Sequence, residues 1–137
     1  MSNFGYHTKE IPKGELGEFS KIQEEYEEFL DALAQDNPIM ALVELCDLYG
    51  AIKAYKEKYE IDYDLQLNYF NDPTYSPLSA MEFCMRRIQR DISLVESQLK
   101  SIEAAIHFYA ENYRLSIYDI RKMSKATERA FASGRRK

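Results

Sequence analysis

The sequence predicts an all-α protein: a bundle of about four helices, with an extra long helix that carries a heptad pattern. A chain of 137 residues is long enough to bury one hydrophobic core, so we expect a single domain. The chain contains only 5 Gly and 4 Pro, and helix-forming residues dominate between them. Apolar residues recur at spacings of three and four, which is the period of an amphipathic helix.

The first helix is expected to run from about Glu15 to Gln35, because Pro12 and Gly14 oppose a helix before it. One apolar stripe at helical spacing predicts its buried face. The stripe consists of Phe19, Ile22, Tyr26, Phe29 and Leu33.

The charged residues of this helix fall into two sets according to their distance from the apolar stripe. Lys21, Glu25 and Glu28 lie on a second stripe directly beside it. The other set is expected to point further outward and consists of Glu24, Glu27 and Asp31.

An Asn-Pro turn predicts the start of a second helix over residues 38–59. Between Ile39 and Ile52, every residue is apolar, aromatic or Gly except Glu44 and Asp47. A helix that is apolar on all sides is a buried helix. Burying an unpaired carboxylate costs several kcal/mol, so these two acidic residues require a cation or paired donors.

Residues 60–76 have no clean period and are expected to form an irregular crossing, after which Ser76 and Pro77 start a third helix. From there an apolar heptad pattern continues until the chain turns near Asn112, which predicts one helix roughly 50 Å long. Its partner is another helix of the chain or a second subunit, and we favour a subunit interface. The pattern, called the heptad seam below, consists of Met81, Met85, Ile88, Ile92, Val95, Leu99, Ile102, Ile106 and Tyr109.

The last helix is predicted to begin after Ser116, where Asp119 completes a capping pattern, and to end near Gly134. Charge is distributed unevenly along the chain. Residues 1–64 hold 15 acidic and 6 basic side chains, a balance of −9, whereas residues 121–137 hold seven basic side chains and one acidic. A metal ion together with a phosphate-bearing small molecule would need such an arrangement; a basic tail that only aids solubility is the alternative.

Several classes of protein are disfavoured by composition. The net charge of −5 argues against a nucleic-acid binder. No apolar run is long enough to span a bilayer, and the N-terminus lacks the apolar core of a signal peptide, so we expect a cytoplasmic protein without a membrane partner. Cys46 and Cys84 have apolar helical surroundings and no CxxC spacing, which indicates reduced core residues.

The acidic residues of the first two helices predict a metal site. Spacings of three place Glu25 with Glu28, and Glu44 with Asp47, on common helix faces. In an antiparallel hairpin these two pairs would face each other and repel strongly unless a divalent cation lay between them. Oxygen ligands without His or Cys favour Mg²⁺, with Mn²⁺ as the alternative.

A di-iron carboxylate bundle is the competing interpretation of these acids, and the sequence disfavours it. Such a site needs Glu-x-x-His pairs, and neither His7 nor His107 is so placed. We interpret His7 as a loop residue rather than a catalytic one, although it could face a nucleotide base.

The Glu-Glu-x-x-Glu run (Glu24, Glu25, Glu28) followed by Glu-x-x-Asp (Glu44, Asp47) resembles the MazG-like all-α nucleoside triphosphate pyrophosphohydrolases, which include dimeric dUTPases and dCTP pyrophosphatases. Residues 5–35 and 119–136 look like bacteriophage-encoded members. The resemblance covers residues 5–59 and 115–136, and residues 60–114 are an insertion relative to the family.

The resemblance implies Mg²⁺ ligation by Glu25, Glu28, Glu44 and Asp47, with Glu24 as a water-positioning group. Glu24 and Glu25 are therefore the candidate catalytic residues. The implied reaction converts a nucleoside triphosphate into a monophosphate and pyrophosphate in a homo-oligomer, a dimer or tetramer. The candidates for contact with phosphate oxygens are Lys21, Lys53, Arg129 and Arg135. The alternative function is a non-catalytic nucleotide-sensing or partner-binding module that uses the long helix.

Overall fold

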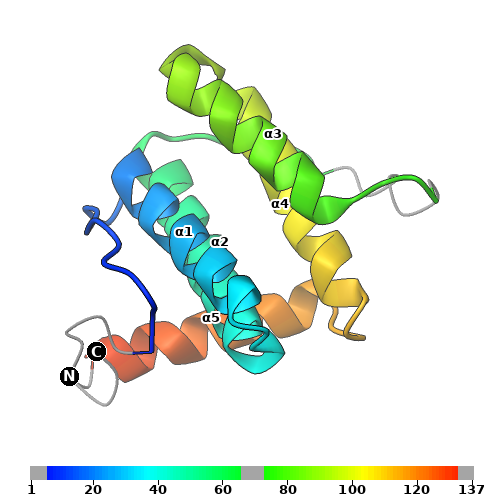
Figure 1. Ribbon diagram of the computed structural model, residues 1–137. Coiled ribbons are helices and arrows are strands. Elements are labelled where there is room, and N and C mark those ends of the chain that lie inside the picture. Colours follow the sequence, from blue (N-terminus) through cyan, green and yellow to red (C-terminus); the bar gives the residue numbers. More distant parts are fainter. Residues whose placement is uncertain (1–5, 66–72, 133–137) are drawn as a thin grey trace. The chain divides into compact units, whose positions relative to one another are not determined.

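The computed structural model describes residues 6–65 and 73–132, and every regular element in these ranges is helical (Figure 1). The prediction of an all-α fold is confirmed. The chain divides into two compact units: Met1–Tyr59 with Arg121–Lys137, and Glu60–Ile120. The predicted insertion, residues 60–114, falls within the second unit. No helix in the described part of the chain is both long and apolar enough to cross a membrane.

The first unit is built on two helices, α1 (Phe19–Ala34) and α2 (Pro38–Lys58), which lie side by side as a hairpin (Figure 1). The connecting turn contains Asp36 in the left-handed region, with φ of 55°. Asn37 then caps α2, because its side chain accepts a hydrogen bond from the backbone N–H of Met40 at 3.2 Å. The predicted Asn-Pro start of the second helix is confirmed.

The first helix begins four residues later than predicted, at Phe19 rather than Glu15. Gly17 explains the delay, because its φ of 88° lies in the left-handed region and cannot belong to a right-handed helix. The core between the two helices consists of apolar side chains with 0% exposure, among them Ile22, Phe29, Leu45, Leu48 and Ile52.

The second unit is a helical hairpin, and the prediction of one continuous helix from Pro77 to about Asn112 is wrong. The segment forms α3 (Pro77–Arg90), a short 3₁₀ turn η2 (Ile92–Leu94) and α4 (Val95–Glu111), and α3 packs against α4 (Figure 1). The helix breaks at Asp91, whose backbone is extended with φ of −150° and ψ of 101°. The Asp91 carboxylate accepts hydrogen bonds from the N–H and the hydroxyl of Ser93, at 3.0 and 2.6 Å, and so stabilises the break.

The heptad seam packs against itself within one chain. Met81, Met85 and Ile88 on α3 are buried, as are Leu99 and Ile102 on α4. The interpretation of this seam as a subunit interface is therefore wrong for these residues, because a helix of the same chain covers them. The heptad pattern of apolar residues continues through the helix break at Asp91, because both helices of a hairpin need a buried stripe at the same spacing.

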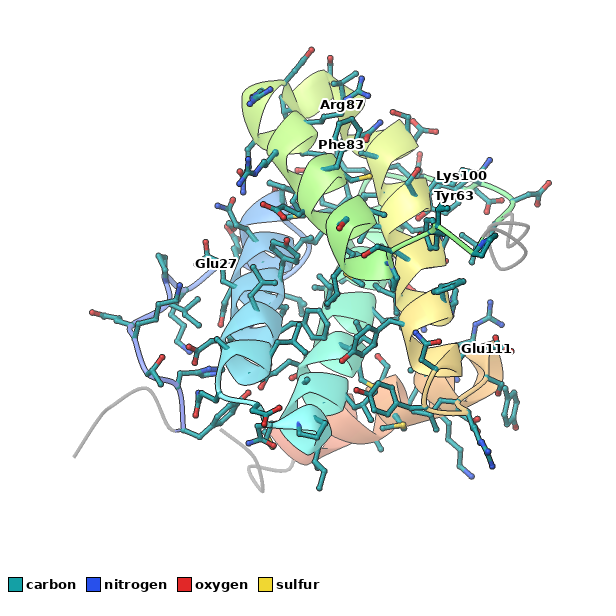
Figure 2. The ribbon with its side chains drawn as sticks, turned by 45° about the vertical axis from the view of Figure 1, so that its right-hand side comes forward. Glu27, Tyr63, Phe83, Arg87, Lys100 and Glu111 are labelled. Atoms are coloured by element: carbon teal, nitrogen blue, oxygen red, sulfur yellow. The ribbon has the colours of Figure 1, made fainter. Side chains whose placement is uncertain are left out.

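At the turn itself the seam residue Ile92 is 57% exposed, because it lies outside the contact between α3 and α4. On the outer side of α3, the guanidinium of Arg87 lies 5.4 Å from the ring centroid of Phe83, one turn before it (Figure 2). Phe83 itself is 60% exposed. Cys46 and Cys84 are both buried and form no disulfide, as expected.

The last helix, α5 (Ile117–Ala132), begins with the predicted capping pattern. The Asp119 carboxylate accepts from the Ser116 backbone N–H at 2.8 Å, and the Asp119 N–H donates to the Ser116 hydroxyl at 3.1 Å. The two residues thus satisfy backbone donors reciprocally, as a capping box does.

Candidate metal centre

The α1–α2 hairpin brings the four predicted metal ligands together. Each of Glu25, Glu44 and Asp47 has one oxygen that lies within 4.8 Å of an oxygen of the other two. A second group of this kind joins Glu25 to Glu28 and Glu24 on α1. The two helices contribute acids to one cluster because the turn between them aligns a face of α1 with a face of α2 (Figure 1).

Two oxygens of the cluster are buried and have no hydrogen-bond partner: Glu25 Oε2 and Glu44 Oε2. Their residues are only 5% and 2% exposed. Leaving a buried polar atom unsatisfied costs about 1–3 kcal/mol, and more when the group is charged. The arrangement is therefore unfavourable for the protein alone and would be relieved by a cation between these oxygens.

Burial and mutual repulsion raise the pKa values of these acids. Desolvation, followed by the charge of Glu28, raises the pKa of Glu25 to about 8. Desolvation, followed by a hydrogen bond and charge repulsion from Glu44, raises the pKa of Glu28 to about 8. The pKa of Glu44 is also raised, mainly by desolvation, with Asp47 adding repulsion. A hydrogen bond between the Glu28 and Glu44 carboxyl groups needs a proton, and a divalent cation at this place would replace that proton.

Lys21 lies against the same cluster rather than in open solvent. Its Nζ is 2.9 Å from Glu25 Oε1 and 3.1 Å from Glu24 Oε1. The ammonium thus compensates part of the negative charge, although it reaches only one of the two oxygens of Glu25. Its side chain is 24% exposed, which leaves it accessible from one side.

Glu24 is buried, with 4% exposure, so the prediction that it points outward is wrong. Its Oε1 accepts from the Gly14 backbone N–H at 2.8 Å, and Lys13 lies 3.6 Å from its other oxygen. Despite desolvation, which opposes ionisation, these donors and Lys21 lower the pKa of Glu24. The segment before α1 folds back over the helix and covers this side chain, which helical periodicity alone could not reveal.

Asp31 was also predicted to point outward, and this prediction is wrong, because the side chain is only 5% exposed. As for Glu24, the segment before α1 covers it. Thr8 donates to it twice, from its hydroxyl at 2.6 Å and its backbone N–H at 3.1 Å. Gln35 Nε2 donates at 3.0 Å, and His7 Nδ1 lies 2.8 Å away. Desolvation opposes ionisation, but the bonds from Thr8 and His7 outweigh it and lower the pKa of Asp31 to about 2.

His7 and Tyr6, neither of which was predicted to contact the metal ligands, lie at the edge of the acidic cluster. The Tyr6 hydroxyl donates to Glu44 Oε1 at 2.9 Å. His7 Nε2 is 3.8 Å from Glu28 Oε2 and 3.9 Å from Glu44 Oε1. The signal that could have found them is weak: two polar aromatic residues in an otherwise irregular segment before an acidic helix.

Of the remaining predicted phosphate contacts, only Lys53 has a described side chain, and it is not joined to the cluster. Lys53 lies six residues after Asp47, which turns its side chain about 120° around α2, and no ion pair joins it to the acids among the described residues. Arg129 lies in α5, but its side chain is outside the described part of the chain, as is all of Arg135. Arg121 of α5 donates from Nε to the Tyr49 hydroxyl at 3.2 Å, a contact that the sequence did not predict.

The donor set fits a hard divalent cation: the atoms are mostly carboxylate oxygens from two rigid helices, and two of them are buried without a partner. Comparisons with protein-family models, with curated proteins and with solved structures found no match to this chain. The resemblance to the MazG-like enzymes continues to depend on the motif residues themselves.

Proposed function

We propose that the protein is a Mg²⁺-dependent pyrophosphohydrolase that cleaves a nucleoside triphosphate to a monophosphate and pyrophosphate. The observation that carries the proposal is the convergence of two acidic pairs with partnerless oxygens on Glu25 and Glu44. A structural ion pair would not leave such oxygens, because its partner would satisfy them. The resemblance of the same residues to the MazG-like motif supports the choice of reaction.

Each residue of the cluster would have a defined role in this reaction. Glu25, Glu28, Glu44 and Asp47 would hold the cation, with Mn²⁺ as an alternative to Mg²⁺. Bound there, the cation would neutralise phosphate charge and lower the pKa of a nucleophilic water.

Lys21 is already half-buried at the cluster, and the arrival of a cation would weaken its pairing with Glu25 by repulsion. We propose that its ammonium then turns to a phosphate oxygen of the substrate. Glu24 has its Oε1 occupied by two donors, so we propose that it acts by positioning Lys21 and the loop at Gly14 rather than by holding water directly.

The test is a panel of ribo- and deoxyribonucleoside triphosphates incubated with Mg²⁺, with pyrophosphate release as the measurement. We expect release from at least one of them, lost on addition of EDTA. Asp47→Asn should lower the rate by at least about a hundredfold, as expected for loss of a group that binds a catalytic cation. Glu57→Gln, an exposed glutamate on the same helix, is the matched control and should keep full activity.

Two outcomes would reject the proposal: no metal-dependent hydrolysis of any nucleotide, or full activity in Asp47→Asn with its helical circular dichroism unchanged. The alternative of a partner-binding module relied on one long exposed helix, and that segment is a hairpin whose seam is buried. An assembly of two or four copies is proposed on the resemblance alone, and light scattering after size exclusion tests it.

A further inference from the structure

The His7 side chain lies in the acidic cluster although its residue comes from the irregular segment before α1. It is only 9% exposed, comparable to core residues. Its Nδ1 contacts Asp31 at 2.8 Å. Asp31 also accepts from the Thr8 N–H and from Gln35 Nε2 through the same oxygen, so this oxygen acts as an acceptor and Nδ1 is the atom that donates. In the neutral imidazole, Nε2 then holds a lone pair.

This lone pair faces two carboxylates at distances that do not suit hydrogen bonds. Nε2 is 3.8 Å from Glu28 Oε2 and 3.9 Å from Glu44 Oε1, whereas hydrogen bonds to nitrogen are about 2.7–3.2 Å long. Donor atoms that share one cation at about 2.1 Å lie about 3.0 Å apart when adjacent and about 4.2 Å apart when opposite. The observed separations fall between these limits. His7, Glu28 and Glu44 each offer an atom within 4.8 Å of the other two.

The surroundings of His7 are those of a metal-binding imidazole. Histidines that bind metals commonly donate their other N–H to a carboxylate, which fixes the tautomer and the ring orientation. Asp31 fills this position, and its own oxygens are fixed by Thr8 and Gln35. Tyr6 donates to Glu44 Oε1, and its ring packs against that of His7, with centroids 4.1 Å apart and planes tilted by 36°.

We propose that His7 Nε2 binds a second divalent cation together with Glu28 and Glu44, beside the position formed by Glu25, Glu44 and Asp47. Glu44 belongs to both groups and would bridge them: its Oε1 lies 3.9 Å from His7 Nε2, and its Oε2 is buried without a hydrogen-bond partner. The inference rests on the proposed metal centre, but it does not depend on hydrolysis or on a particular nucleotide.

The nitrogen ligand gives the two positions different preferences. Imidazole binds Mg²⁺ poorly and Mn²⁺ better, whereas a site of carboxylates alone accepts both. The position with His7 should therefore select Mn²⁺ over Mg²⁺. The structural alternative is that His7 is a cation that pairs with the surrounding acids and binds no metal.

Mn²⁺ itself is the probe, used with the untagged full chain. Pulsed electron paramagnetic resonance detects the coupling between bound Mn²⁺ and the ¹⁴N nucleus of a coordinating imidazole, and a titration gives the number of ions bound. We expect two Mn²⁺ per chain and a histidine nitrogen coupling. His7→Gln should remove that coupling and one of the two ions. Since the chain has only two histidines, a coupling that persists in His7→Gln would come from His107 and would overturn the inference.

Asp31→Asn serves as the positioning variant. It should keep the nitrogen coupling but weaken the affinity of the His7 position about tenfold or more, the effect expected of a lost carboxylate on a metal-binding histidine. Mn²⁺ binding without nitrogen coupling in the wild-type chain would overturn the inference and leave the proposed metal centre intact. No Mn²⁺ binding at all would overturn both.

Discussion

Replacing Glu28 by glutamine is expected to stabilise the cation-free protein and at the same time to reduce its stabilisation by Mg²⁺. The pKa of Glu28 is raised from 4.5 to about 8, so the folded protein holds a proton that the unfolded chain has released. A raised carboxyl pKa makes stability fall as pH rises from about 4.5 to 8, because the unfolded state then binds fewer protons. The glutamine side chain has no charge to desolvate, and its amide could still donate to Glu44.

The magnitude follows from the size of the pKa shift. At pH 7, ionisation of a carboxyl group with a pKa of 4.5 is favourable by about 3.4 kcal/mol, because pH 7 lies about 2.5 above that pKa and each unit is worth about 1.36 kcal/mol; a pKa of about 8 removes this gain. Sharing of the proton with Glu44 and relaxation of the side chains reduce this upper limit, so we expect about 1–2 kcal/mol. For a chain of this length that corresponds to an increase in Tm of about 3–8 °C.

The assay is thermal unfolding followed by circular dichroism at pH 5 and pH 7, in EDTA and in excess Mg²⁺. The wild-type protein in EDTA should be less stable at pH 7 than at pH 5, and Mg²⁺ at about a hundred times its Kd should add about 2.7 kcal/mol. Glu28→Gln should be the more stable protein in EDTA at pH 7, and Mg²⁺ should add much less to it.

Glu27→Gln is the matched control (Figure 2), because Glu27 is the preceding residue of α1 and belongs to none of the three ligand groups in the described chain. It should behave as the wild type in all four conditions. The reasoning would be refuted if Glu28→Gln were less stable than the wild type in EDTA at pH 7, or if Mg²⁺ stabilised both proteins equally.

Four further variants test the fold and the support of the site. Gly14→Ala should destabilise by about 2 kcal/mol or more in urea unfolding, because its Cβ would lie 2.3 Å from backbone atoms of Ser20; a stability equal to wild type would contradict this packing. Asp31→Asn should reduce the loss of stability that the wild type shows as pH falls from about 3.8 towards 2, since the lowered pKa of Asp31 contributes to that loss; the same loss of stability in the variant would contradict this contribution. Asp91→Ala should cost about 1 kcal/mol in urea unfolding, because it removes the cap of the α3–α4 turn; a stability equal to that of the wild type would contradict this role. Ile102→Ala should cost about 2–5 kcal/mol, because this side chain is fully buried in the hairpin, and a cost below about 1 kcal/mol would argue against that burial.

The helices were predictable where a local rule decides their ends. Asn37 with Pro38, Ser76 with Pro77, and Ser116 with Asp119 each start a helix at the expected residue. The break at Asp91 was missed because the heptad pattern continues through it, and an Asp followed by Ser93 is a weak signal within an otherwise regular helix.

In the site, spacing in the sequence was enough to bring Glu25, Glu28, Glu44 and Asp47 together, because residues three apart share a helix face and a short turn makes the two helices antiparallel. Spacing did not predict the burial of Glu24 and Asp31, which the helical periodicity placed on the outward face. Whether a residue beside the core is exposed depends on what covers it, and the covering segment has no periodicity of its own.

The sequence by itself thus determined that the fold is helical and that the four carboxylates lie together, since both features follow from contacts between residues close together in the chain. Only the tertiary structure decided that the heptad seam closes on itself and that His7 reaches the cluster through Asp31. Those features depend on contacts between segments far apart in the chain, whose pairing no local pattern specifies. The acidic pairs remain the centre of the proposed function, and the segment before α1 provides a nitrogen donor beside them.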